Sequence, residues 1–179
     1  MNIKSERLKL KEITWNDLGN IHNLHSIWEV EEFNTIGISN NINETKEQLR
    51  PVIENQKAKI RKYYGWSILI KENNTFIGMA GMTVSNDKFK IGEIYYKLLP
   101  EFWGNGYAIE TAKAIIRFGF NFLKLHRIEA GVATENIKSI KVLEKVGMTK
   151  EGISRKILPI RGEWKDNYHY AIVEDDPRP

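Results

Sequence analysis

The sequence contains no cysteine, has only five prolines, and lacks any long apolar run. Without cysteine, the chain can form no disulfide, no thiolate nucleophile and no cysteine-based zinc site. No segment approaches the roughly 20 apolar residues that a transmembrane helix needs. The first ten residues, MNIKSERLKL, also lack the apolar core of a signal peptide. We therefore expect a cytoplasmic location and no membrane partner.

The chain also lacks a strong charge of either sign. Of its 179 residues, 27 are Lys or Arg and 23 are Asp or Glu, which gives a net charge of +4. The basic residues are scattered, so we expect no nucleic-acid partner, although the basic balance alone keeps nucleic-acid binding as an alternative. His22 and His25 share a helix face without a carboxylate ligand beside them, so we expect no metal.

The apolar content is sufficient for one core, since 41% of the residues are hydrophobic. There is no repeat and no linker rich in Pro, Gly or Ser, so residues 1–179 are interpreted as a single domain. Residue alternation predicts seven strands, and helical spacing predicts four helices. The strands are expected at 7–13, on both sides of a turn at 72–75 within 65–84, at 89–98, at 126–134, and at 148–158 and 164–174 around a turn at 159–162. The helices are expected at 14–27, from 43 or 44 to 62, at 106–123 and from 136 to 146, and 29–42 is interpreted as a loop.

This order of elements predicts an α/β (α+β) fold with a mixed, mostly antiparallel central sheet flanked by helices. Two hairpin-connected strands come before 89–98, and a helix joins 89–98 to 126–134. A crossover of that kind is right-handed and makes the two strands that it joins parallel. The sequence therefore predicts one parallel pair, formed by 89–98 and 126–134.

The stretch PEFWGNGYAIE, residues 100–110, places two glycines directly before a helix. The first turn of a helix exposes N–H groups and carries partial positive charge. Gly104 and Gly106 lack the Cβ atoms that would keep an anion at a distance, so the turn is typical of a phosphate site. It is not a Walker loop, and Ile109 stands where a dinucleotide-binding turn has its third glycine. On spacing alone, a simple tight connection between strand and helix is equally compatible.

The motifs around this turn resemble the GNAT superfamily of acyl-CoA N-acyltransferases, over residues 92–147. Within it they resemble the branch of the Rim-type (RimJ/RimL) ribosomal-protein N-terminal acetyltransferases. The residues that carry the resemblance are Glu93, Ile94, Tyr96 and Leu98, then Pro100, Trp103, Gly104, Gly106, Tyr107, Ala108 and Glu110, and then Asn136, Ser139, Glu144, Lys145 and Gly147.

This resemblance implies a GNAT fold with a splayed parallel pair, and acetyl-CoA as co-substrate. The diphosphate of CoA would lie on the amides of 104–109, and its pantetheine arm would run between 89–98 and 126–134. The residues expected at CoA are Leu98, Trp103, Gly104, Asn105, Gly106, Tyr107, Ala108, Ile109, Asn136 and Ser139. Asn136 is also a favoured residue type for a helix N-cap, and both roles are compatible.

The implied reaction is transfer of an acetyl group to a primary amine, by direct attack and without a covalent enzyme intermediate. The acceptor would be a protein N-terminus or a small-molecule amine. Glu93 is the candidate general base, with an ordinary surface glutamate as the alternative. Many GNAT proteins have a Tyr seven residues after the Asn, as proton donor to the thiolate. Leu143 occupies that position here, so Ser139 is the candidate donor, with a plain polar helix residue as the alternative.

A different class of function remains open, namely a non-catalytic, CoA-binding regulatory module of the same fold. The absence of the Tyr favours this alternative. The sequence shows no chemical signature of the acceptor, whose determinants we expect in 28–64 and 159–168. Oligomeric state is not indicated.

Overall fold

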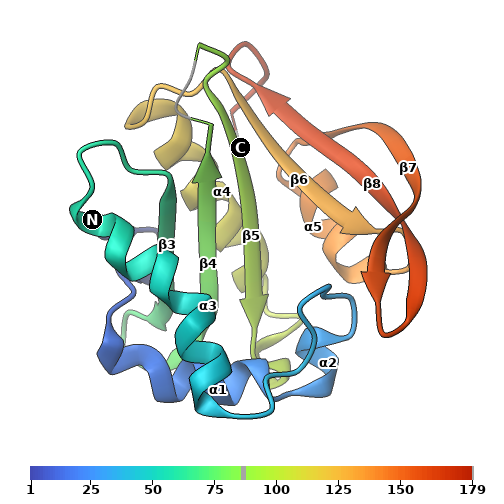
Figure 1. Ribbon diagram of the computed structural model, residues 1–179. Helices are drawn as coiled ribbons and strands as arrows, with labels where there is room; N and C mark the ends of the chain where they lie inside the picture. The colour runs from blue at the N-terminus through green and yellow to red at the C-terminus, as the bar shows by residue number, and fades with distance from the viewer. Residues whose placement is uncertain (86–87, 179) are drawn as a thin grey trace.

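Eight strands form one mixed sheet in the computed structural model, which describes residues 1–85 and 88–178 (Figure 1). The spatial order is β1-β2-β3-β4-β5-β6-β8-β7. Only the contact between β5 and β6 is parallel, and the remaining pairs are antiparallel. The strands are β1 (Ile3–Lys4), β2 (Leu8–Glu12), β3 (Tyr63–Ile70), β4 (Phe76–Val84), β5 (Ile91–Leu98), β6 (Arg127–Ala133), β7 (Thr149–Ile160) and β8 (Glu163–Val173).

Five α-helices in the described part of the chain cover the two faces of this sheet. In Figure 1, α1 and α3 lie across one face, and α4 lies behind the other. The helices are α1 (Leu18–His25), α2 (Trp28–Glu31), α3 (Ile42–Glu54), α4 (Tyr107–Asn121) and α5 (Ile137–Lys145). None of the helices in 1–85 and 88–178 has the length and apolar character required to cross a membrane.

The main core lies between the sheet and α4. One face of α4 contributes Ala112, Ile115 and Ile116, which pack with Ile94 and Leu98 of β5 in the same buried cluster. This packing explains why 106–123 is helical, because its apolar residues recur at helical spacing and find a buried surface. It also fixes the direction of alternate side chains on β5, so that Glu93, Tyr95 and Lys97 point to the opposite face.

The parallel pair is splayed, as expected from the resemblance. The register joins Ile91 to Arg127, Gly92 to Ile128 and Glu93 to Glu129, and it stops there. Beyond Glu93, β5 continues in its ladder with β4, while β6 continues in its ladder with β8. The sheet therefore opens between the second halves of β5 and β6, directly before the glycine turn.

The structure departs from the expected elements in four places. The two-residue strand β1 and the four-residue helix α2 were not predicted, and α2 lies in the segment interpreted as a loop. The helix expected to reach 62 ends at Glu54 and is followed by a 3-10 turn at Asn55–Lys57. Pro51 lies inside α3 without splitting it. The last hairpin is tighter than expected, since β7 runs to Ile160 and β8 starts at Glu163.

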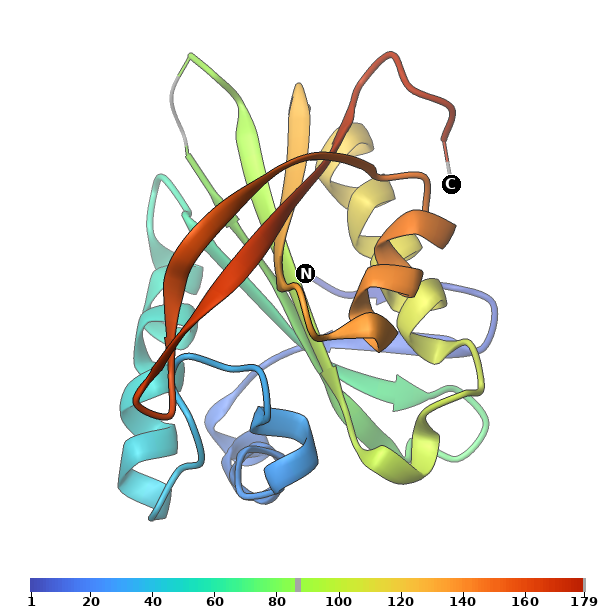
Figure 2. The same ribbon diagram turned by 90° about the vertical axis from the view of Figure 1, so that its right-hand side faces the viewer.

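The β7–β8 hairpin extends away from the body of the sheet and reaches the region of α2, as Figure 2 shows. Its turn consists of Arg161 and Gly162, which both have positive φ angles, 53° and 79°. Such a two-residue turn suits the right-handed twist of a hairpin. The guanidinium of Arg161 lies over the ring of Trp28, at 3.1 Å from the ring centroid. The hairpin tip and α2 are therefore held together.

Candidate active site

The glycine turn lies at one end of a cavity of about 610 Å³, between α4, α5 and α2. Gly104 and Gly106 both have φ angles of 78°, in the left-handed region that favours glycine. A Cβ atom built on Gly104 would meet no atom within 4 Å, so the backbone there faces open space. The first hydrogen bond of α4 is donated by the N–H of Glu110 to the carbonyl of Gly106. The amides of 107–109 therefore have no partner inside the helix and are free to bind an anion.

Arg7, directly before β2, braces this turn from outside the cavity. Its Nη1 donates to the carbonyl of Asn105 at 3.0 Å, and its Nε donates to the Glu110 carboxylate at 2.8 Å. The guanidinium also lies over the ring of Tyr107, 4.5 Å from the centroid. Burial raises the pKa of Glu110, but hydrogen bonds from Arg7 and Ser5 outweigh it and hold that pKa below its usual value. A charged Glu110 thus fixes Arg7, and Arg7 fixes the turn.

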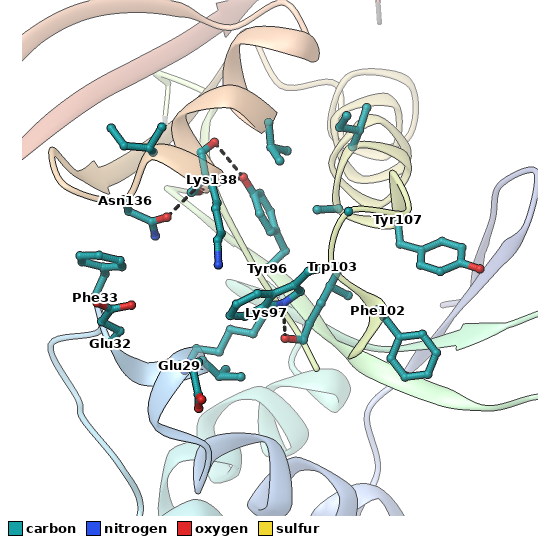
Figure 3. A pocket seen from close by; sticks show the side chains of 18 of the residues that line it. Glu29, Glu32, Phe33, Tyr96, Lys97, Phe102, Trp103, Tyr107, Asn136 and Lys138 are labelled. Carbon is teal, nitrogen blue, oxygen red and sulfur yellow. Dashed lines mark hydrogen bonds between the residues drawn. The ribbon is translucent and has the colours of Figure 1, made fainter. Parts of the chain in front are cut away.

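Trp103 ties the turn to the end of β5. Its indole Nε1 donates to the carbonyl of Leu98 at 2.8 Å, and the Lys138 ammonium lies 4.1 Å from the centroid of its ring (Figure 3). The Leu98 carbonyl, expected at CoA, already accepts this hydrogen bond. Lys138 and Lys145 of α5 both line the cavity and add positive charge to it.

A phenol–hydroxyl pair lies where the splayed strands meet α5. The Oη of Tyr96 and the Oγ of Ser139 are 3.0 Å apart (Figure 3). Burial raises the pKa of Tyr96 to about 12, although its hydrogen bond to Ser139 lowers it in part. The side chain of Asn136 accepts from the N–H of Ser139 at 3.1 Å, so Asn136 is the N-cap of α5. Leu143, which stands at the usual Tyr position, is fully packed in the core.

A second cavity, of about 410 Å³, opens beside the first. Residues from β5, α2 and α5 line both cavities, among them Tyr96, Lys97, Asn136 and Ser139. The second cavity also contains Glu93, which lies on the sheet face opposite α4. Burial raises the pKa of Glu93, and the neighbouring charge of Glu129 raises it further. This places a carboxylate of increased basicity in a cavity that adjoins the Tyr96–Ser139 pair.

Between the cavities, an ion pair joins β5 to α2. Lys97 Nζ lies 2.5 Å from Glu31 Oε1, and the Glu31 side chain is 1% exposed. Burial lowers the pKa of Lys97 although Glu31 counteracts this effect. The other oxygen, Oε2, is buried without a hydrogen-bond partner. The pair therefore holds α2, with Val30 and Phe33, at the mouth of both cavities.

The structure brings most of the expected site residues together, because those of the turn and of α5 line the first cavity. The exception is Asn105, which does not line it and whose side chain bonds to the carbonyl of Trp103. Glu93 lies apart, in the second cavity. No role is predicted from the sequence for Arg7, Tyr96 or Lys97. Tyr96 belonged to the recognised motif, so its position was a usable signal. Within residues 1–85 and 88–178, no three His, Asp or Glu side chains form a group that could hold a metal ion.

Comparison with known proteins decides the family. Residues 7–149 match the family model described as Acetyltransferase (GNAT) domain. The chain belongs to the GNAT family of acetyltransferases. The expected fold and enzyme class are thus confirmed at the level of this family.

Three GNAT relatives illustrate the likeness. The uncharacterized N-acetyltransferase YoaA of Bacillus subtilis (strain 168) is 33% identical over 174 residues, which cover 96% of each chain. A crystal structure of a GNAT-family acetyltransferase from Bacillus anthracis has 31% identity and a TM-score of 0.85, covering 98% of this chain and 100% of that one. RimJ of Mycobacterium smegmatis, solved with CoA-disulfide, has a TM-score of 0.87 at 20% identity, with 98% and 88% covered. The expected likeness to the Rim-type branch is confirmed by this shared fold together with the ribosomal protein uS5-alanine N-acetyltransferase of Escherichia coli (strain K12), which is 28% identical over 118 residues, 65% of this chain and 60% of that one.

Proposed function

We propose that this GNAT protein transfers the acetyl group of acetyl-CoA to a primary amine, by direct attack of the amine on the thioester. The observation that carries the proposal is the meeting of two cavities at the splayed strands. The first cavity contains the glycine turn, the second contains Glu93, and the Tyr96–Ser139 pair lines both cavities.

Several features support CoA as the ligand of the first cavity. The amides of 104–109 offer a site for its diphosphate, and a Cβ at Gly104 would protrude into the open space in front of them. Lys138 and Lys145 add positive charge to the cavity lining. The gap beyond Glu93 leaves room for an extended arm between β5 and β6. RimJ of Mycobacterium smegmatis, which shares the fold, was solved with a CoA derivative.

The chemistry follows from the groups in the second cavity. The attacking amine must be neutral, and Glu93 is suited to accept its proton, directly or through water. A bond forms between the amine nitrogen and the acetyl carbon, and the bond from that carbon to sulfur breaks. The departing thiolate needs a proton, and the Ser139 hydroxyl, paired with the phenol of Tyr96, can supply it. A phenol with a pKa of about 12 stays protonated at neutral pH. Holding both reactants side by side supplies much of the remaining rate enhancement.

The alternative, a non-catalytic CoA-binding module, rested on the missing Tyr at position 143. Tyr96 offers a phenol in place of the missing one, from β5 instead of α5. This favours the enzyme over the silent module. The acceptor class stays a proposal at the level of a primary amine, with a protein N-terminus and a small amine as the two candidates.

The experiment measures the release of the CoA thiol from acetyl-CoA in the presence of a panel of amines. It compares the wild-type protein with the variant Glu93→Gln. We expect kcat to fall by roughly 100-fold or more in Glu93→Gln, with unchanged CoA affinity, as is typical when a general base is lost. The matched control is Glu129→Gln, which removes the carboxylate that pairs with Glu93 in the strand register. It should retain most of the activity. Tight CoA binding with no thiol release on any amine would favour the silent module.

A further inference from the structure

The second cavity contains a buried amide group that the proposed chemistry does not use. Asn167 of β8 lines this cavity and is 6% exposed. Within the described residues, its side chain forms no hydrogen bond with any other protein group. The unpaired amide atoms remain accessible from the cavity, and an occupant that covers them without forming hydrogen bonds costs free energy. An unpartnered, largely buried amide that faces a cavity therefore suggests a ligand that completes its hydrogen bonds.

The placement of Asn167 relative to Glu93 follows from the strand register. Glu93 pairs with Glu129 of β6, whereas Asn167 pairs with Ala133 of the same strand. The amide of Asn167 lies over Gly131, since a Cβ built there would be 3.2 Å from both Nδ2 and Oδ1. Gly131 is two residues beyond Glu129, a distance of about 7 Å along a strand. Glu93 and the amide thus lie on the same face of the sheet, on the two sides of the gap between β5 and β6.

Gly131 leaves the space that this amide occupies. Any larger residue at 131 would bring its Cβ to 3.2 Å from the amide atoms and push them away from the strand. The residues on this part of β6, Gly131 and Ala133, are small and leave space in the cavity above the strand. The walls are formed by apolar side chains, among them Phe33 and Leu158. Three Asn side chains line the cavity. Those of Asn34 and Asn136 already accept hydrogen bonds from backbone N–H groups, whereas the amide of Asn167 keeps both its donor and its acceptor for a ligand.

Resting on the proposed function, we infer that Asn167 is a specificity-determining residue that binds a neutral amide or carbonyl group next to the reacting amine. The amide of Asn167 has Nδ2 as a donor and Oδ1 as an acceptor. An acceptor substrate with an amide two bonds from its amine can satisfy both atoms while the amine lies near Glu93. An alkylamine satisfies neither, and it leaves the amide buried and unpaired. Selectivity of this kind is large when a site built for hydrogen bonds receives a ligand without them.

The test uses two bisubstrate probes, so that it does not depend on turnover. In each probe, the sulfur of CoA is joined through an acetyl group to the nitrogen of glycinamide or of isobutylamine. The two amines have nearly the same branched shape, and only glycinamide can form hydrogen bonds beyond its nitrogen. Calorimetry measures the Kd of each probe and of free CoA. We expect wild type to bind the glycinamide probe roughly tenfold or more tightly than the isobutylamine probe, as for one well-placed pair of hydrogen bonds.

Three variants assign the preference to this residue. Asn167→Leu should bring the ratio of the two Kd values close to one. Asn167→Asp keeps the shape but loses the donor, and should also lower the ratio. Ser154→Ala is the matched control, because Ser154 pairs with Asn167 across β7 and β8 but does not line the cavity. It should keep the wild-type ratio, and an unchanged Kd for free CoA shows that each variant is folded.

Two results would overturn the inference. One is a wild type that binds both probes equally, and the other is an Asn167→Leu variant that retains the full preference for glycinamide. A wild type that does not bind free CoA at all refutes the proposed function instead, so the two failures are distinguishable.

Discussion

The brace formed by Arg7 leads to the most specific prediction, which concerns the substitution Arg7→Met. Methionine keeps an unbranched side chain of similar length but removes the guanidinium. The variant loses the hydrogen bond to the Asn105 carbonyl, the ion pair with Glu110 and the contact with Tyr107. Glu110 is not left unpaired, because the backbone N–H groups of Arg7 and Leu8 and the Ser5 hydroxyl still donate to it. The change therefore loosens the turn without leaving a bare charge.

The magnitude follows from these three contacts. The Arg7 side chain is 45% exposed, so its ion pair with Glu110 contributes no more than about 1 kcal/mol. The hydrogen bond to the carbonyl contributes about 1 kcal/mol, and the contact with the Tyr107 ring about 0.5 kcal/mol. If this energy of about 2 kcal/mol holds the turn in its binding form, its loss weakens CoA binding by roughly 10- to 30-fold. The same loss lowers Tm by roughly 4–8 °C in a chain of this size.

Calorimetric titration with CoA and a thermal melt measure both effects. The control is Arg50→Met, since Arg50 pairs with Glu47 and Glu54 on the exposed side of α3 and does not line the first cavity. It should leave the Kd for CoA unchanged. The variant Glu110→Gln distinguishes two possible roles of Arg7, which are bracing the turn and contacting the phosphate directly. If Arg7 acts as a brace, this variant also weakens CoA binding, because Arg7 loses its anchor. Wild-type affinity for CoA in Arg7→Met would refute the reasoning.

Three further predictions concern the junction of the cavities. Glu129→Gln removes a charge that raises the pKa of Glu93, so the acid limb of the pH–rate profile should move to lower pH, and an unmoved limb would exclude Glu93 as the titrating base. Tyr96→Phe and Ser139→Ala each remove one hydroxyl of the pair, and each should lower kcat more than it raises the KM for acetyl-CoA; if only KM changes, the pair merely binds. Lys97→Met leaves the buried Glu31 carboxylate without its partner and should lower the free energy of unfolding by roughly 3–5 kcal/mol in a denaturant titration, whereas Lys97→Met combined with Glu31→Leu should recover most of it.

Much of the fold was predictable because local signals agreed with each other. The glycines at 104 and 106 do adopt positive φ angles, and Asn136 caps its helix. The helix at 43–62 was predicted too long for a local reason. The side chain of Asn55 accepts hydrogen bonds from the N–H groups of Lys62 and Tyr63, which turns the chain into β3. Such a bond spans seven or eight residues, and helical periodicity does not reveal it.

The site was predictable only where a motif lies within one stretch of chain. The turn and Ser139 belong to such stretches. Arg7 acts on residues about 100 positions away, and the amide of Asn167 occupies space left by Gly131 on a neighbouring strand. No pattern in the sequence signals such contacts, since they arise from the order of strands in the sheet. The four-residue helix α2 has too few residues for a period, and its position depends on the ion pair between Glu31 and Lys97.

The opening of the sheet beyond Glu93 has a consequence for the order of events. The two cavities share residues where they meet and are otherwise lined by different ones, so in the proposed reaction a thioester bound in the first cavity would leave the second open to the amine. On this proposal both reactants are bound at once, and no acyl group is transferred to the protein. Initial-rate plots at several fixed amine concentrations should therefore intersect rather than run parallel. The size of the acceptor would then be limited by the second cavity alone, and not by competition with bound CoA.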